Sequence, residues 1–345
     1  MKLGVLTTGA LGWKTLAGRW RRHMPGWLAQ TPVFLDVQDF EGWESKLPKL
    51  RRLPWLRAAL RGRRAARAAI AVGCDKLFVC TIVDAPLLPL GAARYVVYGD
   101  ATPRQLDALY YGDAHDTPRK RFLRARVSRL GEHGHVFACM SEWYREGVME
   151  DYGVSSANAR ILRPFVDTEL WTPQERSPER PLRMLFVGAD FDRKGGDVII
   201  ELAGRFDPGQ LEWHVVTKEP AQAPAGVFFH TGLQADSEAL VSLARSCGAF
   251  VFPTRADCSP LAVVEAASSG LAVAATRLGG IPDMVADGLS GHLASEPTPD
   301  EFEQIIRRWL DDSELIVRQG RAGRERALAL FSAKAHGEQL LECLA

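Results

Sequence analysis

The stretch from Phe252 to Gly280 constrains this chain most, because an apolar run, a polar loop and a helical pattern follow one another in it. The apolar run that ends at Phe252 has the length of a buried strand. Ser259 is expected to cap the next helix, with Pro260 at its first position, where the missing proline N–H costs nothing. The sequence thus predicts a strand, a short loop and a helix that stops at Gly270.

Two acidic residues flank the predicted start of this helix. Asp257 lies in the loop and Glu265 lies about one turn into the helix, and seven residues separate them. The first N–H groups of a helix have no partner within it, and they lie between the two acids. This arrangement favours binding of a phosphate or a sugar oxygen.

Composition narrows the class of protein. The chain has 345 residues, enough for two domains, with 46% hydrophobic and 25% charged residues, as in water-soluble proteins. A net charge of +1 gives no overall field that attracts a polyanion such as a nucleic acid. The six cysteines lack the spacing of a metal site, which favours reduced thiols in a cytoplasmic protein. No apolar run is long enough to cross a bilayer.

Strand and helix patterns alternate in both halves of the chain. This alternation predicts an α/β protein with two Rossmann-like, doubly wound domains that face each other across a cleft and bind ligands at the carboxyl ends of their strands. We expect the first domain at 1–172, a linker rich in proline and charge at 173–181, and the second domain at 182–330. A last helix is expected within 331–345.

Two glycine-bearing segments follow predicted strands. Gly9 and Gly12 come after the first strand without the GxGxxG spacing, so they either form a tight turn or let the backbone approach a ligand. Gly188 opens a second loop that contains Arg193 and Lys194 before Gly195. Two cations in a glycine-bearing loop suit a diphosphate, although an exposed basic loop is the alternative.

A strongly basic segment runs from Lys46 to Arg67 and contains no acid. Trp55 and several leucines alternate with its basic residues, as in segments that lie on an anionic membrane surface. A solvated helix face is the alternative, and nucleic acid is disfavoured because no binding motif accompanies the charge. A second basic stretch, Arg119–Arg129, could meet the same surface.

The Asp257-x7-Glu265 spacing, followed by a Ser-Gly pair, an apolar strand and Gly279-Gly280-Ile281-Pro282, resembles the nucleotide-sugar motif of retaining glycosyltransferases of family four. The usual pattern there is Glu-x7-Glu, and Asp257 shortens the first acid. Cys258-Ser259-Pro260 replaces the usual Gly-Phe-Gly. The loop from Gly188 to Gly195 is similar to the family's Gly-x4-Arg-Lys-Gly loop.

The resemblance implies the GT-B fold, in which the C-terminal helix returns to the first domain. It implies transfer of a sugar from a UDP- or GDP-sugar to a glycan or lipid-linked acceptor with retention of configuration, in the synthesis of cell-surface polysaccharides or glycoconjugates. The location would be cytoplasmic, with peripheral attachment to the inner membrane face through Lys46–Arg67.

The same resemblance assigns roles to residues. Glu265 would accept the two ribose hydroxyls, Arg193 and Lys194 would neutralise the leaving diphosphate, and Asp257 would hold the donor sugar. Asp100, which follows a predicted strand, would accept a hydroxyl of the acceptor or of the donor sugar, with a turn residue as the alternative. The remaining donor contacts are expected from Gly9, Gly12, Gly188, Thr217, Thr231, Gly232, Cys258, Ser259, Pro260 and Leu261. No metal is expected, since the basic pair supplies the positive charge and the sequence has no Asp-x-Asp.

Two other classes of function stay open. One is a nucleotide-sugar epimerase on the same fold, which would convert donor without an acceptor. The other is a non-catalytic partner in a membrane glycan assembly, which would bind a nucleotide sugar and transfer nothing. The second class stays open because Asp257 is shortened and because the turn at Asp100 lacks the histidine that relatives often carry there.

Overall fold

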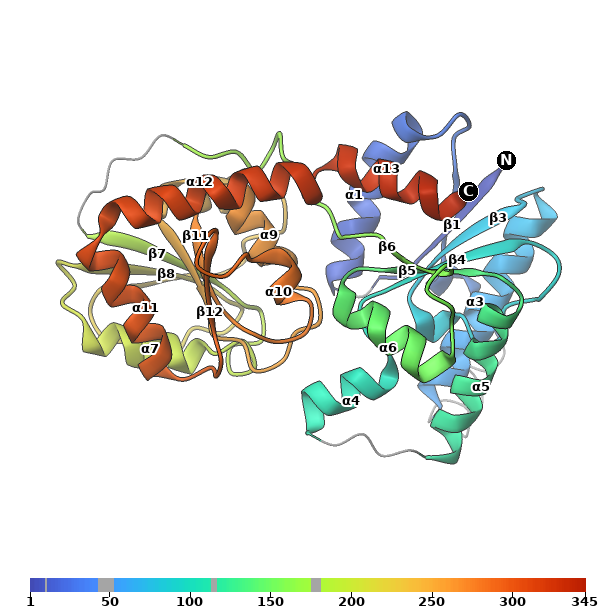
Figure 1. Cartoon of the computed structure of the whole chain (residues 1–345), viewed down its shortest axis with the longest axis horizontal. Coiled ribbons are helices and arrows are strands. Elements are labelled where there is room, and N and C mark those ends of the chain that lie inside the picture. The colour runs from blue at the N-terminus through green and yellow to red at the C-terminus, as the bar shows by residue number, and fades with distance from the viewer. Residues whose placement is uncertain (10, 43–52, 113–116, 175–180) are drawn as a thin grey trace. The chain divides into compact units, whose positions relative to one another are not determined.

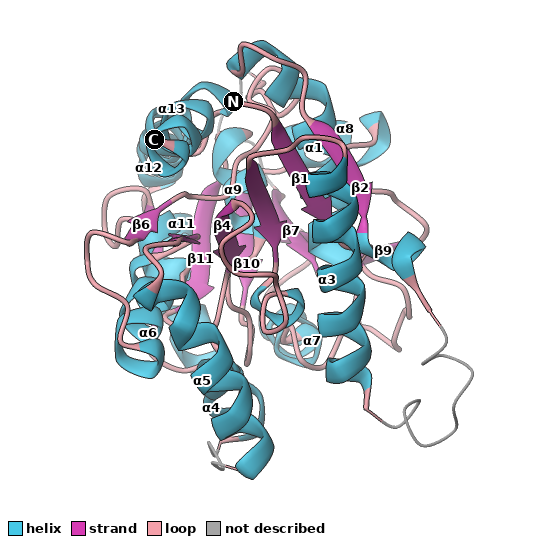
Figure 2. Ribbon diagram, turned by 90° about the vertical axis from the view of Figure 1, so that its right-hand side faces the viewer, coloured by secondary structure: helices cyan, strands magenta, loops and turns pink. Residues whose placement is uncertain are grey.

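The computed structural model describes residues 1–9, 11–42, 53–112, 117–174 and 181–345. Its chain divides into two compact units, 1–164 with 336–345 and 165–335 (Figure 1). Each unit contains a six-stranded sheet whose paired strands all run parallel. Helices (cyan) flank the strands (magenta) in Figure 2. The predicted α/β class with two doubly wound parallel sheets is confirmed.

The sheet of unit 1 has the strand order β2-β1-β3-β4-β5-β6. Its strands are β1 (Leu3–Thr7), β2 (Val33–Asp36), β3 (Lys76–Cys80), β4 (Arg94–Gly99), β5 (Val136–Cys139) and β6 (Ala159–Ile161). Its helical segments are α1 (Leu11–Trp27), η1 (Val37–Phe40), α3 (Pro54–Ala71), η3 (Ile82–Asp84), α4 (Pro103–Tyr111), α5 (Pro118–Glu132), α6 (Glu142–Tyr152) and most of α13 (Ala333–Leu344).

The central strands of unit 1 are apolar along most of their length because both faces of the sheet are covered. Every residue of β1 is buried, and only the first residue of β3 and of β4 is not. Such unbroken apolar runs are typical of parallel sheets covered on both sides. Trp20 of α1 covers one side, with its ring edge-on to Phe78 at 5.3 Å and to Tyr98 at 5.5 Å.

The last helix, α13, is held in unit 1 by a buried histidine. His336 lies on α13 and has no solvent exposure. Trp20 Nε1 donates to His336 Nε2 at 3.0 Å, and His336 Nδ1 lies 2.6 Å from the carbonyl oxygen of Arg163. Because one ring nitrogen accepts, the other must carry the proton and donate to Arg163. Burial lowers the pKa of His336 to about 4.

Unit 2 has the strand order β12-β11-β10-β7-β8-β9. Its strands are β7 (Leu182–Val187), β8 (Leu211–Val216), β9 (Val227–His230), β10 (Ala249–Phe252), β11 (Ala272–Thr276) and β12 (Gly291–Ala294). Its helices are α7 (Gly196–Arg205), α8 (Glu238–Ser246), α9 (Leu261–Ser268), α10 (Ile281–Met284), α11 (Pro299–Asp311) and α12 (Ser313–Leu330). From β7 the chain proceeds outward through β8 and β9, and it then returns to β10 on the other side of β7. The strand order therefore reverses between β7 and β10, where doubly wound sheets open a crevice for ligands.

Close backbone packing holds α12 against the sheet of unit 2. A Cβ atom on Gly320 of α12 would lie 2.1 Å from the carbonyl oxygen of Gly270, which no larger residue could tolerate. All five residues of β11 are buried, and three of them are alanines. Small residues on both sides let α12 approach the strand closely.

Two local expectations differ from the structure, and both concern the start of α9. Ser259 does not cap α9, because the helix begins at Leu261 and Pro260 is its N-cap without a side-chain hydrogen bond. The proline therefore precedes the helix instead of occupying its first turn. The unit boundary falls after Pro164, and the part of the expected linker at 175–180 lies outside the described residues.

The basic segment Lys46–Arg67 is described from residue 53 on, and its first part lies outside the described residues. Its described part forms most of α3, whose alanines at 58, 59, 65, 66 and 69 are buried. One face of α3 therefore packs on unit 1, and the arginines occupy the rest of the helix. Among the helices that the structure describes, none combines the length and apolar character needed to cross a membrane.

His336 should make the stability of unit 1 depend on pH. Its pKa is about 6.5 in an unfolded chain and about 4 in the fold, so between these values the unfolded chain binds a proton that the fold excludes. The free energy of unfolding should therefore fall by about 2 kcal/mol between pH 7 and pH 5 on account of this group.

The measurement is denaturant unfolding followed by tryptophan fluorescence at both pH values, in the wild type and in His336→Gln. Glutamine offers one donor and one acceptor but does not titrate in this range. The variant should lose about 2 kcal/mol less than the wild type between the two pH values. An equal loss in both proteins would show that His336 is not the group responsible.

Candidate functional site

The candidate site of unit 2 lies where the strand order reverses. The loop after β7 contains Arg193 and Lys194, and the loop after β10 contains Asp257. Because β7 and β10 are paired in parallel, both loops leave the carboxyl edge of the sheet side by side. The topology thus brings together residues that stand more than sixty positions apart in the sequence.

A glycine lets the two loops touch. Gly195 has a φ of 81°, and a Cβ atom at this position would lie 2.0 Å from the carbonyl oxygen of Pro253. Any other residue would have to displace the backbone of the neighbouring loop, and it would also adopt a left-handed conformation that side chains disfavour. Gly195 therefore fixes the distance between the loops.

Hydrogen bonds join the loops around this contact. The N–H of Arg255 donates to the carbonyl of Arg193 at 2.9 Å, and Arg193 Nη1 donates to the carbonyl of Ala256 at 2.6 Å. Arg193 Nε also donates to Asp190 Oδ2 at 2.8 Å. The hydroxyl oxygen of the buried Thr254 lies 3.4 Å from the carbonyl oxygen of Arg193 and 3.3 Å from that of Ala256, so it can donate to either. The guanidinium of Arg193 is thus held on both sides before any ligand binds.

Lys194 and Asp257 form an ion pair across the two loops. Each side chain is only 14% exposed. Burial, and then the neighbouring charge of Arg193, lower the pKa of Lys194 to about 7, while the nearby carboxylate of Asp190 opposes this shift. The lysine Nζ also lies 5.2 Å from the centre of the Phe252 ring. A charged lysine at this position therefore depends on a nearby anion.

A turn that contains Gly279 and Gly280 packs against the loop of Asp257. Gly279, with a φ of 54°, has no room for a Cβ atom, which would lie 2.4 Å from the carbonyl oxygen of Asp257. The N–H of Gly280 donates to the carbonyl of Cys258 at 2.7 Å. The motif glycines thus set the course of the loop that carries the acid.

The helix α9 follows this loop directly. Glu265 lies on α9 and is buried. Cys258 and Pro260 are buried too, whereas Ser259 and Leu261 are partly exposed. The hydroxyl of Ser259 is shielded from solvent, and no hydrogen bond to it is found among the described residues. The predicted acids Asp257 and Glu265 thus lie before and within α9, as the spacing indicated.

The remaining predicted donor residues of unit 2 follow β7, β8 and β9. The N–H of Gly188 donates to the carbonyl of Val216 at 2.9 Å, and that of Thr217 donates to the carbonyl of His230 at 3.2 Å. Thr217 is buried, and Thr231 and Gly232 are exposed. Since β10, β7, β8 and β9 are neighbours in the sheet, all these residues lie in one row along its carboxyl edge.

The other three predicted site residues belong to unit 1. Gly9 follows β1 and packs against the side chain of Gln38, and Gly12 lies in the first turn of α1. Asp100 follows β4, and burial raises its pKa to about 6. The structure thus separates the predicted residues into two sets, one on each sheet.

Sequence reasoning missed Asp84 of unit 1. It ends η3, directly after β3, and is buried. Thr81 Oγ1 donates to it at 3.2 Å, and burial raises its pKa to about 7. The position of an acid shortly after a predicted strand could have been noticed in the sequence. Its burial under α3 could not, because that depends on the tertiary structure. Sequence reasoning also missed Asp190 and Thr254, which hold Arg193 and its loop.

Within the described residues, no group of three or more His, Cys, Asp or Glu side chains is arranged to hold an ion. All six cysteines are buried and free of disulfides.

Among the comparisons with known proteins, the match to a protein family lies within unit 2. Residues 167–326 match the family model described as glycosyl transferases group 1. Among curated proteins, D-inositol 3-phosphate glycosyltransferase of Corynebacterium glutamicum is 27% identical over 258 residues, which cover 67% of this chain and 62% of that protein. For two further relatives the match spans about half of the relative's length.

Solved structures share the fold over the whole chain. Sucrose-phosphate synthase of Thermosynechococcus elongatus superposes with a TM-score of 0.76 and 15% identity, covering 100% of this chain and 98% of that one. HepE of Anabaena, solved in complex with UDP and glucose, gives a TM-score of 0.69 with 15% identity and covers 100% and 99%. At this identity the likeness concerns the fold alone, which is the GT-B arrangement.

The contact between Gly195 and Pro253 predicts a large cost for a small substitution. Gly195→Ala should lower the free energy of unfolding by about 2 kcal/mol or more, since it adds a steric clash to a strained backbone. Gly204→Ala is the matched control, because Gly204 lies in α7 with no atom near its Cβ position. The control should be neutral or stabilising by up to about 1 kcal/mol. Thermal unfolding of both variants checks this, and equal melting points would mean that the loops separate without cost.

Proposed function

We propose that this chain is a glycosyltransferase that transfers a sugar from a nucleotide-sugar donor, a UDP- or GDP-sugar, to a glycan or lipid-linked acceptor with retention of configuration. The match of residues 167–326 to the family model described as glycosyl transferases group 1 supports this proposal. The observation that carries the proposal is the pair Arg193 and Lys194, held beside Asp257 at the carboxyl edge of the sheet. Two cations and a carboxylate at the reversal of strand order suit a diphosphate joined to a sugar.

The chemistry that the residues can supply starts with the leaving group. In the proposal, the diphosphate takes the place of Asp257 as the partner of Lys194, and Arg193 donates to it from the other side. The negative charge that develops on the leaving oxygen is then stabilised by groups already in position. Their loops are fixed by hydrogen bonds before the donor arrives, so little reorganisation is needed.

The rest of the donor binds along the same edge of the sheet in this proposal. Asp257, released from Lys194, accepts hydroxyls of the donor sugar. Glu265 offers two carboxylate oxygens, which match the two ribose hydroxyls. Thr217, Thr231 and Gly232 lie after β8 and β9 and frame the base. HepE, which shares the fold, was solved with UDP, and this supports a nucleotide donor.

Asp100 of unit 1 completes the proposal as a residue that accepts a hydrogen bond from an acceptor hydroxyl. Its raised pKa of about 6 leaves it largely ionised at neutral pH, as a hydrogen-bond acceptor requires. Gly9 and Gly12 let the backbone at the end of β1 approach a ligand. Attachment to an anionic membrane surface through Lys46–Arg67 remains part of this proposal.

Lys194→Gln tests the role of the basic pair. It should lower the turnover of sugar transfer by about 10²–10³-fold, as removal of one group that stabilises developing charge does. It should also abolish the rise in melting temperature that UDP or GDP causes in the wild type, since bound ligand stabilises the fold by mass action. Thermal shift with UDP, GDP and ADP identifies the base at the same time.

The control is Lys334→Gln, an exposed lysine of unit 2. It should keep both the turnover and the thermal shift. If Lys194→Gln keeps them as well, Lys194 does not bind the diphosphate. Conversion of a UDP-sugar without an acceptor would indicate an epimerase instead, and a thermal shift without any transfer or hydrolysis would indicate a non-catalytic binding partner.

The pKa of Lys194 predicts how donor binding depends on pH. A lysine with a lowered pKa loses its charge as pH rises, so the affinity for UDP should weaken between pH 7 and pH 9, where the phosphate of UDP is already ionised. Arginine keeps its charge throughout this range. Calorimetric titration should therefore show a pH-dependent affinity in the wild type and a nearly constant one in Lys194→Arg. The same decline in both proteins would assign the titration to another group.

A further inference from the structure

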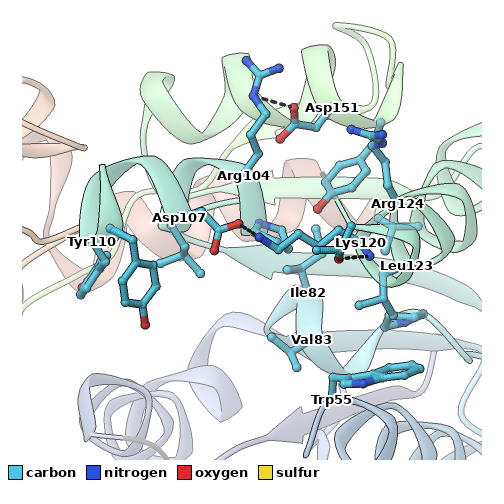
Figure 3. A pocket seen from close by; sticks show the side chains of 17 residues that line it. Trp55, Ile82, Val83, Arg104, Asp107, Tyr110, Lys120, Leu123, Arg124 and Asp151 are labelled. Carbon is cyan, nitrogen blue, oxygen red and sulfur yellow. Dashed lines mark hydrogen bonds and ion pairs between the residues drawn. The ribbon is translucent and has the colours of Figure 1, made fainter. Parts of the chain in front are cut away.

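Unit 1 contains a pocket of about 640 Å³ that no predicted site residue lines (Figure 3). It lies next to η3 and α4, which directly follow β3 and β4, so it opens near the carboxyl edge of the sheet. Trp55 of α3, Leu123 of α5 and Tyr152 at the end of α6 form other parts of its wall. Its volume is within the range of small-molecule sites, about 300–1,000 Å³.

The wall of the pocket is mainly apolar and aromatic. The apolar and aromatic lining residues are Trp55, Ile82, Val83, Pro86, Pro103, Leu106, Tyr110, Tyr111, Leu123, Val127 and Tyr152. Several of them face solvent to an unusual degree, with Tyr111 exposed by 81% and Val83 by 45%. Exposed apolar side chains that gather at a pocket mark a binding surface, whereas scattered ones do not.

Charged side chains at the pocket are mostly cationic. Arg104, Lys120 and Arg124 line it. Lys120 forms an ion pair with Asp107, and Arg104 Nε lies 3.3 Å from Asp151 Oδ1, as Figure 3 shows. The pocket lining therefore contains three cationic side chains and two carboxylates.

The helices around the pocket add to this positive charge. The segment of α5 contains six basic residues and a single acid, Glu132, and the segment of α3 contains five arginines and no acid. On α6, by contrast, four acids stand beside a single arginine, so the positive charge is concentrated on the α3 and α5 side of the pocket. An apolar pocket with one strongly basic side attracts a ligand that is both apolar and negatively charged. A sugar or a peptide would leave its polar groups unpaired against these walls, which costs free energy.

We propose that this pocket binds the apolar part of an anionic amphiphile, such as an alkyl phosphate, and that the anionic group contacts basic side chains of α5. We also assign this amphiphile as the acceptor of the transferred sugar. In that transfer a hydroxyl oxygen of the amphiphile forms a bond to the anomeric carbon of the donor sugar, the bond from that carbon to the diphosphate breaks, and the nucleoside diphosphate leaves with the hydroxyl proton. The assignment as acceptor rests on the function proposed above, whereas the binding itself does not.

The test compares three small probes by calorimetric titration of the full chain. The probes are octyl phosphate below its micelle concentration, octanol and inorganic phosphate. Octyl phosphate should bind, and each of the other two should bind at least about tenfold more weakly, because each lacks one of the two groups that the site recognises. Inorganic phosphate binding as tightly as octyl phosphate would show an anion site without a role for the pocket.

Two pairs of variants locate the site. Val83→Glu puts a charge into the apolar wall, and it should weaken octyl phosphate binding at least about tenfold. Leu328→Glu is its control, because Leu328 is a similarly exposed apolar residue of unit 2, at 43%. Arg124→Gln should weaken binding of octyl phosphate but not of octanol, and Arg318→Gln of unit 2 should change neither. Unchanged affinity in Val83→Glu would overturn the proposal.

Two further outcomes have a clear meaning. Binding to vesicles with anionic lipid, without binding of octyl phosphate, would mean that the surface of unit 1 docks on a membrane and that the pocket stays empty, which overturns the proposal. Thermal shift with UDP and GDP separates this inference from the proposed function. Octyl phosphate binding without any nucleotide binding would overturn the transferase and keep the pocket, and nucleotide binding without octyl phosphate binding would overturn only the pocket.

Discussion

The contact of Gly195 with the carbonyl of Pro253 determines the geometry of the candidate site more than any other interaction. It brings two loops together at the point where the strand order of unit 2 reverses. The backbone bond from Arg255 to Arg193 and the side-chain bond from Arg193 to Ala256 are possible only at this separation. A rigid frame of backbone therefore holds the cations, and the site does not depend on flexible side chains finding one another.

The electrostatics of the site follow from that frame. Lys194 is largely buried next to Arg193, which lowers its pKa, and it forms an ion pair with Asp257. A buried ion pair costs desolvation energy, so it is a poor way to gain stability. In the proposed function, the same pair holds the lysine where the diphosphate of the donor would replace the carboxylate as its partner. Binding of a diphosphate would explain why a cationic side chain is buried at this position.

The sequence predicted much of the fold correctly. Strand and helix alternation indicated two parallel sheets, and short apolar runs such as Ala249–Phe252 coincide with observed strands. The first helical residue after Asp257 was placed one position too early, since a proline is equally compatible with the N-cap and the first turn. The aromatic pocket of unit 1 was not predicted, because its lining comes from α3, η3, α4, α5 and α6, and no motif links them.

By itself, the sequence determined the class of fold, the family that unit 2 resembles and the residue types of the candidate donor site, because these depend on local periodicity and on a spacing within one segment. Tertiary structure alone decided that Lys194 contacts Asp257, that Gly195 is indispensable to the loop contact, and that Asp84 and His336 are buried with shifted pKa values. These properties arise from the approach of segments distant in sequence. Burial and distance set the electrostatic energy of a charged group, and neither can be read from its neighbours along the chain.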